Sequence, residues 1–176
     1  SINPIPLQYN LPSINLKHLK KMTTDFGIVQ FSKINQPDID SGYTLDDNAR
    51  AMIAMCQHFE FTASEITLKY IELYLNFIRY CLQSDSFFLN YINEQREFTE
   101  QNYSTDLADA NGRAIWALGY LISMNSLPKE LVQKAEVIMC TALIYADKIS
   151  SPRAMAFTIK GLYYQCTKNA SAQNIL

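Results

Sequence analysis

The sequence lacks both a strong charge imbalance and a long apolar run. Among its 176 residues, lysine and arginine total 15 and aspartate and glutamate total 17, which gives a formal net charge of -2. A chain without a basic excess does not favour nucleic acid as a partner. No run of about 18 or more consecutive apolar residues occurs, so we predict no transmembrane helix and no membrane partner.

Motifs for several kinds of chemistry are also missing. The five glycines are scattered, so no glycine-rich loop is available to bind phosphate. No GxSxG stretch marks a serine nucleophile. His18 and His58 each stand alone, without a second histidine or an acid at metal-ligand spacing. We therefore expect no metal site and no cofactor.

Cysteine is infrequent, and its spacing does not suggest a metal site or a redox motif. Cys56, Cys81, Cys140 and Cys166 lie inside apolar helical stretches, without a CxxC pair. This placement predicts four buried thiols in a reducing compartment, and hence a cytoplasmic protein.

What the sequence does contain is helical periodicity. Segments 48–59, 110–124 and 153–164 are apolar nearly all round, which indicates burial on several sides. Segments 62–83 and 128–147 are amphipathic, with charges on one face. The alternation of an inner apolar helix with an outer amphipathic helix predicts an all-α fold, built as a ring of helical hairpins.

The remaining segments suggest one domain with an extended start. Residues 1–13 contain three prolines and read as an extended lead-in to a single helical domain over 14–176. A short strand is expected at 28–31, inside an otherwise irregular stretch. The connection 84–104 is too long for a passive link, so it is either functional or locally structured. The C-terminal "NASAQNIL" fits a chain that is a fragment of a longer protein.

A short motif recurs at the starts of the apolar helices. The stretches "NARAMIAM", "NGRAIWAL" and "SPRAMAFT" align on the arginines Arg50, Arg113 and Arg153. In the first two copies an aspartate and an asparagine precede the arginine by four and two residues, namely Asp46 and Asn48, and Asp109 and Asn111. The third copy has neither residue. The coincidence favours an internal repeat of helical hairpins with loops of different length.

The stretches "SGYTLDDNARA" and "GRAIWALG" carry a resemblance to a known family. Over roughly residues 14–124, the chain resembles the all-helical domain that accompanies bacterial group 1 glycosyltransferases. That domain is similar to the (α/α) toroids, which include glycoside hydrolases with six helical hairpins. The resemblance implies a carbohydrate ligand and a partial or small toroid, because a six-hairpin ring needs about twice as many helices. It also suggests a glycosyltransferase domain or a second copy of the chain as a partner.

The motif has an interpretation that needs no function. Asp46 and Asp47 at a helix start can accept backbone N–H groups, and they stand at i,i+4 and i,i+3 spacing to Arg50. Asp109 and Arg113 repeat the i,i+4 spacing. Helix caps and ion pairs therefore account for the polarity.

The alternative interpretation is that these helix starts surround one pocket. Parallel inner helices place their N-termini at the same end of a ring, where carboxylates and amides could bind sugar hydroxyls and aromatic rings could stack on the sugar. The candidate acids for catalysis are Asp46 or Asp47 together with Asp109, since glycosidases use two carboxyl groups about 5–10 Å apart. The candidate sugar-binding residues are Tyr43, Asn48, Arg50, Asp106, Asn111, Arg113 and Trp116.

Two functions follow from these observations. The first is an enzyme that acts on a glycan, such as a glycoside hydrolase. The second is a non-catalytic module that binds sugar or protein beside a glycosyltransferase. The absence of the aspartate from the third copy of the motif favours the second function, the binding module. The repeated Asp-x-Asn-x-Arg-Ala favours a shared pocket under either function.

Overall fold

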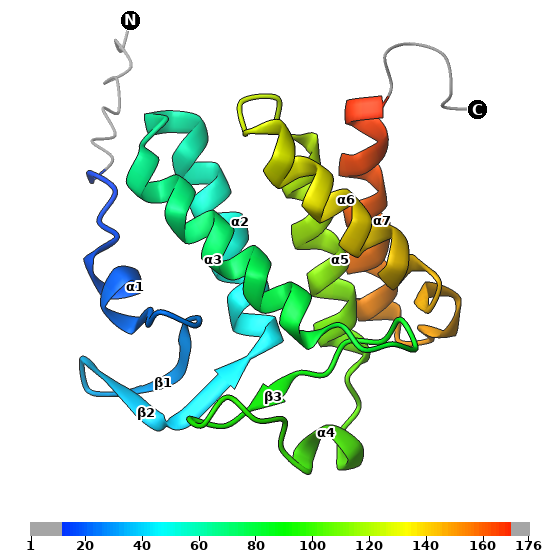
Figure 1. Cartoon of the computed structure of the whole chain (residues 1–176), viewed down its shortest axis with the longest axis horizontal. Coiled ribbons are helices and arrows are strands. Elements are labelled where there is room, and N and C mark those ends of the chain that lie inside the picture. Colours follow the sequence, from blue (N-terminus) through cyan, green and yellow to red (C-terminus); the bar gives the residue numbers. More distant parts are fainter. Residues whose placement is uncertain (1–11, 170–176) are drawn as a thin grey trace, which may run out of the picture.

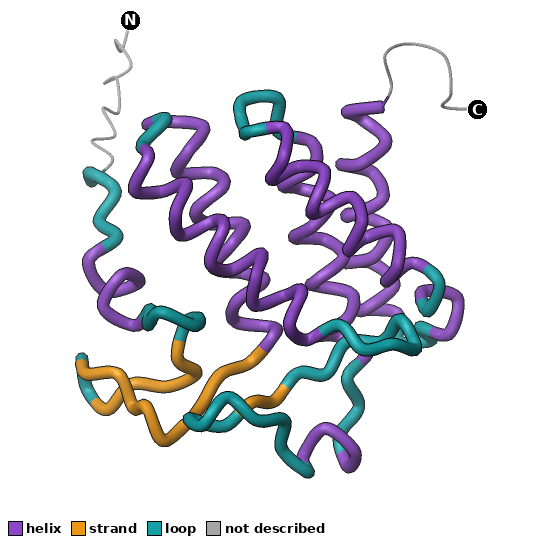
Figure 2. Tube along the Cα trace, in the orientation of Figure 1, coloured by secondary structure: helices purple, strands orange, loops and turns teal. Residues whose placement is uncertain are grey.

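A computed structural model describes residues 12–169, and it is mostly helical with a small three-stranded sheet (Figures 1 and 2). The sheet lies below one end of the helices. The predicted helical class is confirmed, but the chain is not purely α, because it also contains these strands. Its described elements in chain order are α1 (Lys17–Met22), β1 (Val29–Lys33), β2 (Gln36–Thr44), α2 (Leu45–Thr62), α3 (Glu65–Cys81), β3 (Tyr91–Ile92), α4 (Gln101–Ser104), α5 (Ala108–Ser123), α6 (Lys129–Leu143), a 3₁₀ turn (Ala146–Lys148) and α7 (Pro152–Asn169).

The helices lie in two rows, but α7, whose segment was predicted to be buried on several sides, exposes Met155, Ile159 and Tyr163. In Figure 1, α3 and α6 lie in front of α2, α5 and α7. Helix α2 packs on α3 and α5, and α5 packs in turn on α6 and α7. The predicted helix over 153–164 is longer than expected, because α7 continues to Asn169. Most of the predicted lead-in lies outside the described residues.

The sheet is the part of the fold that sequence patterns did not predict. Strand β2 pairs antiparallel with β1 and with β3, and its residues 36–43 were expected to be irregular. Gly42 allows β2 to pass β3, because its φ is +66° and an added Cβ would meet the backbone of Ile92. The predicted strand at 28–31 corresponds to β1. Strand β2 then runs directly into α2, which fixes where the first copy of the motif begins.

Helices α5 and α7 approach each other through residues without bulky side chains. A Cβ added to Gly112 would lie 2.5 Å from the carbonyl oxygen of Ala154, and one added to Gly119 would collide with the backbone of Gly161. Both pairs have the same offset along the chain, so the two helices run parallel. Close backbone packing of parallel helices places their N-termini at one end of the molecule.

The long connection between α3 and α5 is locally structured. It contains β3 and α4, and its backbone also forms bridges between Leu82 and Phe88 and between Ile92 and Phe98. The side chain of Asn102, which is 5% exposed, accepts from the backbone N–H groups of Asn90 and Tyr91. The connection therefore lies as a fixed layer beside the start of α2.

The cysteine prediction is half wrong. Cys56 and Cys81 are buried, and burial raises the pKa of both thiols. Cys140 and Cys166 are exposed, because each lies on a side of its helix that no described element covers. None of the described helices combines the length and apolar composition that a membrane span requires.

Candidate functional site

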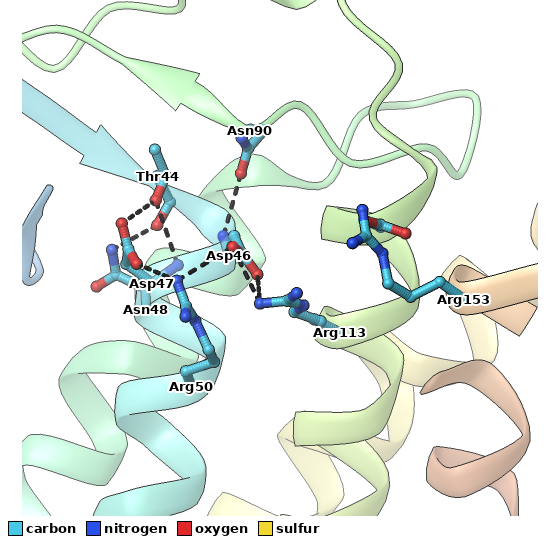
Figure 3. Close-up of polar contacts among 9 residues, drawn as sticks. Thr44, Asp46, Asp47, Asn48, Arg50, Asn90, Arg113 and Arg153 are labelled. Atoms are coloured by element: carbon cyan, nitrogen blue, oxygen red, sulfur yellow. Dashed lines mark hydrogen bonds and ion pairs between the residues drawn. The ribbon is translucent and has the colours of Figure 1, made fainter. Parts of the chain in front are cut away.

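The start of α2 is capped by the residue before it. The hydroxyl of Thr44 accepts from the backbone N–H of Asp47 at 3.2 Å and donates to Asp47 Oδ2 at 2.6 Å (Figure 3). Asp47 Oδ1 in turn lies 2.5 Å from Arg50 Nη2. The predicted cap and i,i+3 pair are therefore both present, and together they hold the Asp47 carboxylate in one orientation.

Asp46 lies between arginines from two helices. Its Oδ2 lies 3.2 Å from Arg50 Nη2 on its own helix, and its Oδ1 lies 2.9 Å from Arg113 Nη1 on α5. The side chain of Asn90, from the long connection, accepts from the Asp46 backbone N–H. Burial raises the pKa of the Asp46 carboxyl above its usual value, although Arg50 and Arg113 oppose this shift. Desolvation thus outweighs the attraction of both guanidinium groups.

The second copy of the motif pairs differently from the sequence prediction. The carboxylate of Asp109 forms its ion pair with Arg153 on α7, whereas Arg113 at i,i+4 is directed to Asp46. The aspartates of α2 and α5 therefore each pair with the arginine of the next inner helix. The ion pairs follow the internal repeat across α2, α5 and α7, which i,i+4 spacing alone does not predict.

The repeated asparagines perform matching structural tasks. The Asn48 amide accepts from the N–H of Ile28 and donates to the carbonyls of Ile28 and Thr44. The Asn111 amide accepts from the N–H of Phe88 and donates to the carbonyls of Phe88 and Leu107. Asn48 and Asn111 are 0% and 2% exposed. They lie beneath the surface, with each amide bound to the backbone before its helix.

The two aromatic candidates have partners within the chain. Tyr43 is buried, and its hydroxyl lies 3.2 Å from that of Thr24. The Trp116 ring stacks on Phe157 of α7 at a centroid distance of 5.7 Å, and Lys160 Nζ lies 3.8 Å from its ring centroid. These contacts join α5 to α7. The Tyr43 ring also packs against Phe26 and Phe77, so both rings proposed to stack on a sugar already contact side chains of the chain itself.

Six half-exposed or exposed side chains remain at this end of the inner helices, and we call them the rim. They are Asp46, Asp47, Arg50, Asp109, Arg113 and Arg153. Three are acidic and three are arginines, so their formal charges sum to zero. Asp106 lies apart from these ion pairs, since its carboxylate accepts from the backbone N–H of Ala108 at the start of α5.

A groove lies beside the rim, on the side of α2 that faces away from α5. It has a volume of about 560 Å³ and lies between α1, β1 and α2. Asp47 and Arg50 reach its edge, but its lining is mainly apolar and includes Leu19, Met22 and Val29. Neither Asp46 nor Asp109 lines it, so this groove does not bring two of the candidate acids together.

Two residues at this end of the inner helices, Arg153 and Asn90, were not among the predicted site residues. Arg153 could have been included, because the repeat aligns it with Arg50 and Arg113. Asn90 had no signal, since only the folded connection brings it to Asp46. Among residues 12–169, no group of three or more histidine, cysteine or acidic side chains is placed to hold a metal ion. No protein-family model matches the chain, and no curated protein matches it.

Proposed function

We propose that this chain is a non-catalytic carbohydrate-binding domain and that the rim is its binding surface. The observation that carries the proposal is the position of Asp46, whose carboxylate is bound by arginines from both α2 and α5. The hydrogen-bond donors and acceptors of α2 and α5 are thereby held side by side at the N-terminal end of these helices. A sugar presents hydroxyl groups that both donate and accept, so it suits such a surface.

The zero net charge of the rim favours a neutral ligand. A phosphate or carboxylate ligand would meet three aspartates, and a cationic ligand would meet three arginines. The ion pairs also fix the rotamers of these side chains before a ligand arrives, which lowers the entropic cost of binding. Neutral oligosaccharides are therefore the ligand class that we propose.

The arrangement of helices supports a place among the (α/α) toroids. Helices α2, α5 and α7 form an inner row, and α3 and α6 cover α2 and α5 from outside. We propose that this row is part of a toroid and that the domain accompanies a glycosyltransferase, as the sequence resemblance implies. The free thiols at the surface, Cys140 and Cys166, fit a reducing, cytoplasmic setting.

Glycoside hydrolysis is the second candidate, and one observation favours it. The raised pKa of Asp46 is the direction that a general acid requires. Against it, Asp46 and Asp109 are each paired with an arginine of the following helix, which leaves neither acid free to face a common bond. A catalytic role predicts that Asp109→Asn abolishes turnover and leaves sugar binding nearly unchanged.

Binding to a panel of neutral and charged oligosaccharides tests the proposal, followed by calorimetric titration of any ligand found. We expect a neutral oligosaccharide to bind, and Arg50→Ala to weaken that binding about tenfold, a loss of roughly 1.4 kcal/mol. Lys33→Ala is the matched control, because Lys33 also forms an exposed ion pair, with Asp38, but lies on the sheet. Equal affinity of wild type and Arg50→Ala, or no bound oligosaccharide, would contradict the proposal.

A further inference from the structure

Another cavity lies between three loops, at the end of the helices where the sheet also lies (Figure 1). Its volume is about 380 Å³. It is bordered by Phe87 of the long connection, by residues 105–108 at the start of α5 and by residues 145–151 between α6 and α7. None of the rim residues lines it. Ligand pockets in proteins span about 300–1,000 Å³, so this cavity is large enough for one small molecule.

Polar side chains without a partner in the protein line this cavity. Thr105, Ser150 and Ser151 contribute hydroxyl groups, and none of the three forms a side-chain hydrogen bond within residues 12–169. The carboxylate of Asp106 accepts from the backbone N–H of Ala108 through Oδ1, and no described residue donates to its Oδ2. A hydroxyl both donates and accepts, whereas a carboxylate accepts. The cavity therefore offers hydrogen bonds of both kinds to a ligand.

One wall of the cavity is aromatic. The rings of Phe87 and Tyr145 contact each other at a centroid distance of 4.6 Å, and both side chains are half-buried. Lys148 Nζ lies 5.0 Å from the centroid of the Tyr145 ring. An aromatic wall beside hydroxyl groups suits a ligand that has both an apolar face and polar substituents.

The charges at the cavity cancel. Among the described residues that line it, Lys148 is the cation and Asp106 is the anion. A phosphate would gain the lysine but would meet the carboxylate, and a cation would meet the reverse. A wholly apolar ligand would bury the hydroxyl groups without a hydrogen bond, which costs free energy. A small neutral molecule with several hydroxyl groups meets none of these penalties.

We propose that this cavity, which we call the loop pocket, binds one neutral monosaccharide. The hydroxyl groups of the sugar would exchange hydrogen bonds with Ser150 and Ser151 and donate to Asp106 Oδ2, while the C–H face of the sugar ring packs on Tyr145. The volume lies at the lower end of the range for ligand pockets, so it suits a single ring. The proposal goes beyond the rim and depends only on the lining of the pocket itself. It also gives Asp106 a role that the rim ion pairs do not.

An amide-resolved NMR titration of the whole chain tests the proposal. The probes are glucose, galactose, mannose and N-acetylglucosamine, with inorganic phosphate as the charged comparison. We expect one or more of the sugars to shift the amides of residues 105–108 and 145–151 saturably, and phosphate to leave them unchanged. Ser150→Phe should raise the dissociation constant for that sugar by about tenfold or more, because the added ring fills the pocket. Ser126→Phe, at an exposed serine between α5 and α6, is the matched control and should leave the affinity unchanged.

The position of the shifts separates the loop pocket from the rim. Monosaccharide shifts confined to the amides around Asp46, Arg50 and Arg113 would overturn the loop pocket and leave the proposed function of the rim standing. Phosphate that shifts residues 145–151 at lower concentration than any of the sugars would overturn the choice of a neutral ligand. The proposal is also overturned if none of the four sugars causes a saturable shift, or if Ser150→Phe binds as tightly as wild type. Circular dichroism of each variant shows that it is folded.

Discussion

The carboxylate of Asp46 on α2 binds the guanidinium of Arg113 on α5, with 2.9 Å between Oδ1 and Nη1. The residues are 67 positions apart in the chain and belong to two copies of one motif. Asp109 and Arg153 repeat the relationship between α5 and α7. The motif thus links neighbouring helices as well as capping its own, and the rim is the surface that these links create.

Replacing Arg113 by methionine should destabilise the fold more than the same change at Arg153. Arg113 is only 19% exposed, and its loss leaves the half-buried Asp46 carboxylate with one arginine fewer. We expect a loss of about 1–3 kcal/mol in the free energy of unfolding for Arg113→Met. For Arg153, which is 72% exposed, we expect less than about 1 kcal/mol. Urea denaturation measures both values, and equal losses would contradict the different burial of the two pairs.

The Asp46 carboxyl should make stability depend on pH in a defined direction. Burial raises its pKa in the folded state above the usual value of 3.8, so the folded protein holds the proton more tightly than the unfolded chain. Its stabilising contribution is full below the unfolded pKa and is lost as the pH rises through the folded pKa. The stability of Asp46→Asn relative to wild type should therefore increase as the pH rises from below the unfolded pKa to above the folded pKa. An Asp46 carboxyl that titrates below 3.8 in an NMR titration would contradict this.

Asn111→Asp should be strongly destabilising although it changes one atom. The buried amide donates to the carbonyls of Phe88 and Leu107, and a carboxylate cannot donate. Two buried acceptors would lose their partner and a charge would be buried, at a cost of roughly 2–4 kcal/mol. The exposed Asn125 provides the control, because Asn125→Asp should change stability little. Thermal unfolding of the two variants checks the difference.

Gly161→Ala should destabilise the protein, although helix propensity alone predicts the opposite. Propensity alone favours alanine in a helix by about 1 kcal/mol. At this position, however, an added Cβ would collide with the backbone of Ile115 on α5, so α7 must move away. We expect a net loss of about 1–3 kcal/mol. Ala156→Gly, at an exposed position of α7, isolates the propensity effect. A more stable Gly161→Ala would show that α5 and α7 are not in backbone contact.

Local patterns predicted most of the helices but not the contacts between them. Apolar periodicity correctly marked α2 and α5 as buried helices. It wrongly marked α7 as buried on several sides, because Met155, Ile159 and Tyr163 are exposed on that helix. Strand β2 was missed because its exposed half, with Pro37 and Asp38, has no alternation of apolar residues. Backbone pairing with β1 and β3 makes this segment a strand.

The candidate site was predictable in composition and not in geometry. The repeat located the aspartates, asparagines and arginines at the helix starts. Spacing within one helix could not show that Asp109 would bind Arg153, because that contact depends on how closely α7 approaches α5. Nor could it show that Asn48 and Asn111 turn inward to the backbone, since the loops that they bind lie 20 and 23 residues away in the chain.

An amide-resolved NMR titration with the neutral oligosaccharide that binds most tightly in the panel tests the central claim most directly. If the rim binds carbohydrate, the shifts should concentrate at the starts of α2 and α5, around Asp46 and Arg113, and saturate with one dissociation constant. The exposed edge of the sheet near Ile34 should stay unchanged. Saturable shifts confined to residues away from the rim, or no shifts with any neutral oligosaccharide, would contradict the account.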